Sequence, residues 1–186
     1  MKTRSIYSFI ILSLLLSCKA VTKQKTVLPL EVQTEIGEEG ETVVLGYLNR
    51  ANLNTEEFNA WFQPEYDNLQ FPEGWVEEHL PLAKNLHFKI FIGTWCGDTQ
   101  RELGGIFKIL DALEITDEQI QMYGLSENKD SPAGYEKEFE IYNIPTVIFM
   151  EKGKENNRFV ELPVETVIQD FSKILKKEPY LNAYAE

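Results

Sequence analysis

Cys96 is the residue of this 186-residue chain with the clearest potential for chemistry. It lies in the segment Trp95-Cys96-Gly97-Asp98-Thr99, which follows an apolar run over residues 88–92 and precedes apolar residues at helical spacing. A thiolate attacks a disulfide to form a mixed disulfide, and in a Cys-x-x-Cys pair a second thiol three residues later releases it. Thr99 stands at that later position. The sequence therefore provides an attacking thiol without an intramolecular resolving thiol.

The predicted helix start after Cys96 affects the balance between thiol and thiolate. Unpaired backbone N–H groups and the helix dipole stabilise a thiolate at this position, and the Thr99 hydroxyl is a candidate donor to it. The carboxylate of Asp98 acts in the opposite direction, because its negative charge is close and it competes for the same N–H groups. We expect Trp95 to cover the sulfur. The sequence leaves the balance open and predicts a reactive, partly exposed thiol.

The N-terminal segment has the features of an export signal. Two basic residues precede an apolar stretch from Ile6 to Leu16, which is too short to span a bilayer. The segment Leu15-Leu16-Ser17-Cys18 resembles the bacterial lipoprotein signal, which implies that Cys18 is lipidated and anchors the chain to a membrane of the bacterial cell envelope, facing the periplasm or exposed at the surface. Cys96 is then the one free thiol of the mature protein. A conventional signal peptide or an uncleaved anchor is the alternative.

Composition excludes several other classes of function. The formal charge of −12 comes from 30 acidic and 18 basic residues, and the basic residues form no cluster, so we expect no nucleic acid partner. His79 and His87 lie apart from any cysteine pair, so the spacing of a structural zinc site does not occur. We interpret both as surface or edge histidines, and we expect neither a metal nor a cofactor.

The length is that of one globular domain with short appendages. We predict a signal peptide over residues 1–17, a lipid-anchored tether over 18–41, a folded domain over 42–178 and a C-terminal tail over 179–186. The tether is predicted because residues 19–41 are polar and Pro and Gly interrupt any periodicity.

Within the domain, runs of strand-forming residues alternate with apolar residues at helical spacing. We predict a helix from an N-cap at Asn54 until Pro64 stops it, and a kinked helix over 75–86. The remaining expected elements are strands at 42–48, 88–92, 119–125, 146–150 and 158–162, a helix after the Cys96 segment, a short helix within 131–142 and a final helix near 167–175.

Residues 42–178 resemble the thioredoxin superfamily. Two signals carry the resemblance: the segment around Cys96 between a strand and a helix, and Ile144-Pro145-Thr146 about fifty residues later at the start of a strand. The resemblance implies an α/β fold, a thioredoxin-like three-layer α/β/α sandwich with a mixed central sheet and a cis-proline loop. It also implies that Pro145 faces Cys96 and that the backbone of Ile144 pairs with bound substrate.

Three departures from the family pattern limit the chemistry. Thr99 replaces the second cysteine, Ile90 aligns with the family's buried acidic group, and Gly104 aligns with a proline that commonly follows the motif. The first two changes disfavour dithiol reductase activity.

Two functional hypotheses from different classes remain open. In the first, Cys96 is a monothiol oxidoreductase or isomerase that acts on exported proteins with disulfides or thiols, and an external or substrate thiol resolves the mixed disulfide. Oxidation to a sulfenic acid, as in a redox sensor, is a related possibility. In the second, the domain is a binding module without turnover for an envelope partner. An exposed cluster of aromatic side chains beside Cys96 favours the binding hypothesis, whereas buried aromatic side chains leave the Cys96 thiol as the main functional group. The candidate aromatics are Trp61, Phe62, Tyr66 and Trp75.

Overall fold

The computed structural model describes residues 32–185 of the chain. The predicted signal peptide, Cys18 and most of the predicted tether lie outside the described residues. Within residues 32–185, no helix is long and apolar enough to cross a membrane.

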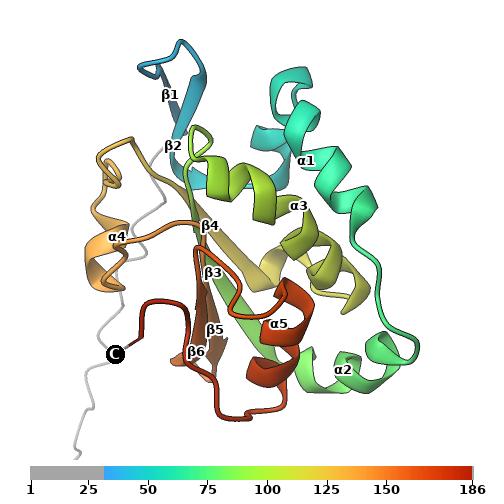
Figure 1. Cartoon of the computed structure of the whole chain (residues 1–186). Helices are drawn as coiled ribbons and strands as arrows, with labels where there is room; N and C mark the ends of the chain where they lie inside the picture. Colours follow the sequence, from blue (N-terminus) through green and yellow to red (C-terminus); the bar gives the residue numbers. More distant parts are fainter. Residues whose placement is uncertain (1–31, 186) are drawn as a thin grey trace, which may run out of the picture.

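A six-stranded mixed sheet forms the middle of the domain (Figure 1). Its strands follow the spatial order β1-β2-β4-β3-β5-β6; β3 and β4 are parallel, and the other neighbouring pairs are antiparallel. The strands are β1 (Gln33–Ile36), β2 (Thr42–Leu48), β3 (Leu86–Ile92), β4 (Ile120–Gly124), β5 (Thr146–Glu151) and β6 (Lys154–Val160).

Helices cover both faces of this sheet. Four of them lie on one face and α4 lies on the other (Figure 1). The three-layer α/β/α sandwich with a mixed sheet is therefore confirmed, as is the cis bond between Ile144 and Pro145, and the fold is thioredoxin-like. The helices are α1 (Glu56–Asn68), α2 (Trp75–Ala83), α3 (Gly97–Ala112), α4 (Tyr135–Glu138) and α5 (Val167–Leu175), with the short 3-10 helices η1 (Arg50–Leu53) and η2 (Asp117–Gln119).

The main core lies between the sheet and the four helices α1, α2, α3 and α5. The apolar stripe of α3 is buried there together with side chains of β3, β5, β6 and α5. Full burial of a large aliphatic or aromatic side chain contributes about 1.5–3 kcal/mol relative to exposure. The largest buried members are the phenylalanines Phe88, Phe107, Phe149, Phe159 and Phe171.

A smaller cluster packs on the α4 face of the sheet. It contains Phe91, Tyr123 and Ile148 from three neighbouring strands, together with Cys96 and Ile144. The Cys96 segment and the cis-proline loop therefore meet at the border of this second cluster, away from the main core.

The folded domain extends beyond the predicted boundaries at both ends. Residues 33–36, within the predicted tether, form β1 and pair with β2 from Gln33 opposite Leu45 to Ile36 opposite Thr42. All four residues of β1 are exposed, so this edge strand has no apolar alternation that would identify it. At the other end, Tyr180 of the predicted tail is buried and its hydroxyl donates to Asp170 Oδ2 at 3.0 Å.

The prediction that Pro64 ends a helix is wrong, because Pro64 lies inside α1. A proline removes the hydrogen bond to the carbonyl four residues earlier, which belongs to Ala60. Both residues are exposed, so water can reach that carbonyl. Other boundaries also move: α2 ends at Ala83, and β6 begins at Lys154, four residues earlier than predicted.

His79 is fully buried, so its interpretation as a surface histidine is wrong. Its Nδ1–H donates to the Trp75 carbonyl at 2.6 Å, and its Nε2 accepts from the Ser172 hydroxyl at 2.5 Å. The ring also stacks on Trp75 with centroids 4.3 Å apart. His79 thus fastens α2 to α5, whereas His87 is exposed as expected.

Candidate functional site

Cys96 occupies the turn that joins the central strand β3 to α3. It is the N-cap residue of α3, with extended backbone angles (φ −79°, ψ 122°). Its N–H donates to the Gly93 carbonyl at 3.0 Å, and its own carbonyl accepts from the Gln100 N–H at 3.0 Å, which starts the helix. The first N–H groups of an α-helix have no partner inside the helix. Cys96 is therefore beside backbone donors that favour negative charge.

The Cys96 sulfur lies against the cis-proline loop. Its Sγ–H donates to the carbonyl oxygen of Ile144, the residue before Pro145, at 3.6 Å. Cys96 is 8% exposed, and the thiol is more enclosed than the partly exposed group that we expect from the sequence. The cause is the packing of Ile144, which is fully buried, and of the α4-face cluster around the sulfur.

Close packing below the Cys96 segment requires glycine at position 93. A Cβ atom there would lie 2.6 Å from Trp95 Nε1 and 2.8 Å from Ile144 Cδ1. At Gly97, on the exposed side of the segment, a Cβ would meet nothing within 4 Å. The segment is thus tightly packed at Gly93 and has free space beside Gly97.

Trp95 ties the segment to the end of β4. Its indole N–H donates to the Leu125 carbonyl at 3.0 Å, and the half-buried ring packs against the same cluster as Cys96. This hydrogen bond fixes the ring relative to the sheet.

Thr99 is fully buried on the inner side of α3. Its hydroxyl oxygen accepts from the Gly93 N–H at 3.3 Å. Among residues 32–185, no hydrogen bond joins this hydroxyl to the Cys96 sulfur. The structure therefore shows Thr99 closing the turn between β3 and α3.

Asp98 forms an ion pair and does not cap the helix. Its Oδ1 lies 2.6 Å from Arg101 Nη2, one helical turn later, and Arg101 also pairs with Glu102 at 2.9 Å. The hydrogen bond to Asp98, followed by that to Glu102, raises the pKa of Arg101. The charge of Asp98 is thus balanced locally, which weakens its effect on the nearby thiol.

The residues at the two other departures from the family pattern are in the interior. Ile90 is fully buried in the main core and provides no proton acceptor. Gly104 lies where α1 crosses α3: a Cβ there would lie 2.4 Å from the Phe62 carbonyl oxygen and 2.6 Å from the Tyr66 nitrogen. Glycine at this position permits the close contact between the two helices.

The aromatic residues of the binding-module hypothesis do not surround the thiol. Trp75 is buried in the main core, and the three aromatics of α1 pack against that core, whereas Cys96 belongs to the cluster on the other face. The exposed aromatic cluster that would favour the second hypothesis is therefore not beside Cys96.

Thr94 is a site residue that sequence reasoning missed. It is buried; its hydroxyl donates to the Thr42 carbonyl at 2.8 Å and accepts from the Val44 N–H at 3.1 Å. The Gln100 side chain in turn donates to the Thr94 carbonyl at 2.9 Å. These bonds hold the segment against β2, and no pattern in the sequence identifies them because the partners are about fifty residues apart.

Across residues 32–185, no group of three or more histidine, cysteine, aspartate or glutamate side chains is placed to hold a metal ion. The site consists of one thiol, backbone donors of α3 and the Ile144 carbonyl.

No protein-family model matches the chain, and no curated protein matches it. Solved structures similar to it include a protein of unknown function from Pseudomonas aeruginosa (TM-score 0.42, 16% identity, covering 63% of this chain and 70% of that chain). Thioredoxin O2 from Arabidopsis thaliana in the oxidised state has a TM-score of 0.37 and 14% identity over 55% of this chain and 87% of that chain. Mitochondrial thioredoxin 3 from Saccharomyces cerevisiae has a TM-score of 0.36 and 16% identity over 61% and 98%. The description of this chain as thioredoxin-like rests on its own sheet order, helix layers and cis-proline loop.

Proposed function

We propose that this protein carries out thiol–disulfide exchange through the single thiol of Cys96, and that a lipid on Cys18 holds it at the bacterial cell envelope. The observation that supports the exchange is the placement of the sulfur: it lies at the N-terminus of α3 and 3.6 Å from the Ile144 carbonyl oxygen. Cys96 is also the one free cysteine within residues 32–185.

The exchange has two balanced steps. The Cys96 thiolate attacks one sulfur of a substrate disulfide; the new S–S bond makes a mixed disulfide, and the other substrate sulfur leaves as a thiolate and takes a proton from solvent. A second thiolate, from the substrate or an external thiol, then attacks the substrate sulfur of the mixed disulfide. Cys96 leaves as a thiolate, ready for another cycle. The two steps rearrange disulfides without net oxidation or reduction of this protein.

Substrate orientation depends on the cis-proline loop. The backbone of Ile144 pairs with an extended substrate segment, and its carbonyl exchanges the Cys96 S–H donor for a substrate N–H. Entry is from the Gly97 side, where the space beside the segment is open. Trp95, held by its bond to Leu125, forms a fixed wall of the site.

Trapping of mixed disulfides tests the exchange. The full chain is isolated from its native envelope, and its disulfide-linked partners are separated without reductant and identified by mass spectrometry. Wild type forms reductant-sensitive adducts, Cys96→Ser forms none, and Thr99→Cys shows fewer because the added thiol releases the substrate. Thr99→Ser, a matched control that keeps the hydroxyl accepting from the Gly93 N–H and adds no thiol, behaves like wild type. Identical partner profiles for wild type and Cys96→Ser would rule out the exchange.

Acyl labelling tests the anchor separately. Cells that express the full chain receive a labelled fatty acid, and the protein is recovered from the membrane fraction. Wild type and Cys96→Ser incorporate the label, whereas Cys18→Ser does not and leaves the membrane fraction. Retention of the label by Cys18→Ser would contradict lipidation at this residue without affecting the proposal for Cys96.

A further inference from the structure

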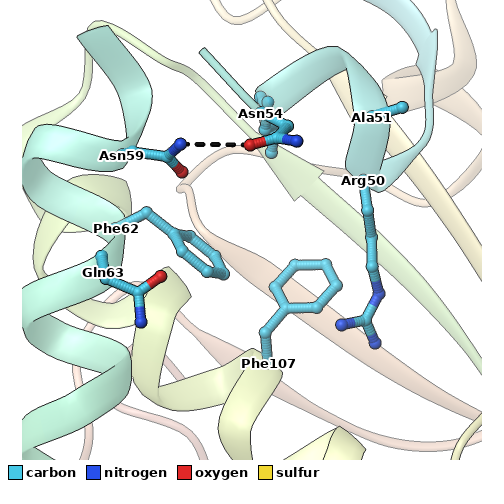
Figure 2. Close-up of a pocket in the computed structure, with 8 residues that line it drawn as sticks. Arg50, Ala51, Asn54, Asn59, Phe62, Gln63 and Phe107 are labelled. Carbon is cyan, nitrogen blue, oxygen red and sulfur yellow. Dashed lines mark hydrogen bonds between the residues drawn. The ribbon is translucent and has the colours of Figure 1, made fainter. Parts of the chain in front are cut away.

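A second site lies at the other end of α3 from the thiol. A partly open cavity of about 290 Å³ is lined by η1, α1 and the side chain of Phe107 (Figure 2). Phe107 follows Cys96, the N-cap residue of α3, by eleven positions, which is about 16 Å along the helix axis at 1.5 Å per residue. The cavity is therefore distinct from the Cys96 site.

Two phenyl rings form the apolar wall of this cavity. Phe62 of α1 and Phe107 of α3 lie with ring centroids 5.8 Å apart and planes inclined by 57°. Figure 2 shows the two rings side by side, with Arg50 beyond Phe107. The guanidinium lies 4.5 Å from the Phe107 centroid and so supports that ring. Phe107 is 1% exposed, so the half-buried ring of Phe62 supplies the accessible aromatic surface, which favours an aromatic ligand through edge or offset stacking.

Three side-chain amides supply the polar rim. Asn59 Nδ2 donates to Asn54 Oδ1 at 3.1 Å, and Gln63 Nε2 donates to Asp67 Oδ1 at 3.0 Å. Within residues 32–185, these bonds leave the Asn54 amide nitrogen, Asn59 Oδ1 and Gln63 Oε1 without a protein partner. The rim therefore offers one donor group and two acceptors to a ligand.

The charge of the cavity selects against ions. Among the described residues that line it, Arg50 alone is ionised at neutral pH. Its guanidinium is already held by Asp111 at 2.6 Å and by Asp117 at 2.9 Å. The lining has no free cation to pair with an anionic ligand and no carboxylate to pair with a cationic ligand. Binding of either ion therefore has a desolvation cost that no ion pair offsets.

We infer that this cavity binds a small neutral molecule with one aromatic ring and an amide-like group that both donates and accepts hydrogen bonds. The ring stacks on Phe62, above the buried Phe107, and the amide group meets Asn54, Asn59 and Gln63. A volume of about 290 Å³ accommodates one such ring with its substituent, near the lower end of the usual range for ligand pockets. The inference is independent of the thiol chemistry, because none of these residues belongs to the Cys96 site.

Three probes of matched size test the inference by NMR on the isotope-labelled full chain in detergent micelles. Benzamide has the ring and the amide, cyclohexanecarboxamide has the amide without the aromatic ring, and benzoate has the ring with a negative charge. Benzamide binds with a roughly millimolar Kd and shifts the side-chain amide signals of Asn54, Asn59 and Gln63. Cyclohexanecarboxamide binds about two- to ten-fold more weakly, as loss of aromatic contacts predicts. Benzoate shifts none of these signals.

Two variants locate the binding. Ala51→Phe, at an exposed position on the cavity wall, fills the space and abolishes the benzamide shifts, and Asn59→Ala weakens them. Asn68→Ala, an exposed change on the same helix outside the cavity, leaves them unchanged. Equal binding of benzamide and benzoate, or benzamide shifts that persist in Ala51→Phe, would overturn the inference; mixed-disulfide trapping by Cys96 is unaffected in either case.

Discussion

The close crossing of α1 over α3 gives a sharp prediction about two adjacent glycines. In Gly104→Ala, the new Cβ falls 2.4 Å from the Phe62 carbonyl oxygen and 2.6 Å from the Tyr66 nitrogen. Both obstacles are backbone atoms, so relief requires a shift of a whole helix. In Gly105→Ala, the new Cβ falls 3.4 Å from Leu69 Cδ1, the end of a flexible side chain. Both substitutions add one methyl group to α3, but the added Cβ atom contacts backbone in one variant and a side chain in the other.

The expected changes in the free energy of unfolding differ clearly between the two variants. Alanine in place of a helical glycine stabilises by up to about 1 kcal/mol in both cases. Overpacking against backbone costs about 3 kcal/mol or more in Gly104→Ala, at the upper end of the usual range. We therefore expect Gly104→Ala to lower the free energy of unfolding by about 2 kcal/mol and Gly105→Ala to change it by less than about 1 kcal/mol in the stabilising direction.

Urea titration followed by circular dichroism measures the difference. With a slope of about 2 kcal/mol per molar urea, a difference of about 3 kcal/mol separates the two midpoints by about 1.5 M. The slope itself should not change, because the same surface is exposed on unfolding. Equal midpoints for Gly104→Ala and Gly105→Ala would refute the contact between the α1 backbone and position 104, and with it the packing that positions the thiol-bearing helix.

Three further predictions concern the Cys96 site and the α4 face of the sheet. Gly93→Ala displaces the indole and isoleucine that enclose the thiol, so alkylation of Cys96 by iodoacetamide becomes faster, while Gly97→Ala, where the added Cβ meets nothing within 4 Å, leaves the rate near that of wild type. Asp98→Asn removes a negative charge near the thiolate and speeds alkylation at neutral pH by about two- to five-fold at low ionic strength, corresponding to about 0.3–1 kcal/mol; a rate that is unchanged, or insensitive to salt, contradicts this reasoning. Burial, followed by the neighbouring tyrosines, raises the pKa of Tyr123 to about 12, so the folded state keeps the proton that the unfolded state loses near pH 10. The stability gained from this group is complete below pH 10 and is lost between about pH 10 and 12. The free energy of unfolding of Tyr123→Phe therefore falls less steeply with pH over that interval than that of wild type. Identical slopes of the free energy of unfolding against pH for the two proteins argue against the shift.

Elements with strong periodicity could be predicted from the sequence. The stripe of α3, the strand over residues 88–92 and the strand that begins at Thr146 all appear as expected, because each buries a repeated apolar face. The exposed edge strand β1 has no such face, and its pairing with β2 depends on backbone hydrogen bonds that do not depend on side-chain type. Pro64 was an equally poor guide, because it lies inside α1, where the carbonyl that loses its helical partner belongs to the exposed residue Ala60.

The residues of the candidate site could be predicted from the sequence, whereas most of their hydrogen bonds and ion pairs could not. Cys96 and Pro145 were identified from short motifs, and the structure brings their loops together. The partners of Thr99 and Asp98 were not predicted, because Thr99 bonds to Gly93 before the helix begins and Asp98 pairs with Arg101 one turn later, and packing selects these contacts. The cavity beside Phe107 was also outside the reach of sequence patterns, since its walls come from three separate elements.

The amino-acid sequence alone specifies the chemistry available to this protein: one thiol after a central strand, no second thiol three residues later, and a proline loop about fifty residues away. The environment of that thiol depends on the tertiary structure. Enclosure of the sulfur, its donation to the Ile144 carbonyl and the local balancing of Asp98 by Arg101 depend on which side chains lie within a few ångströms. Residue type sets which interactions a group is able to make, and the distances fixed by packing set which of them it makes.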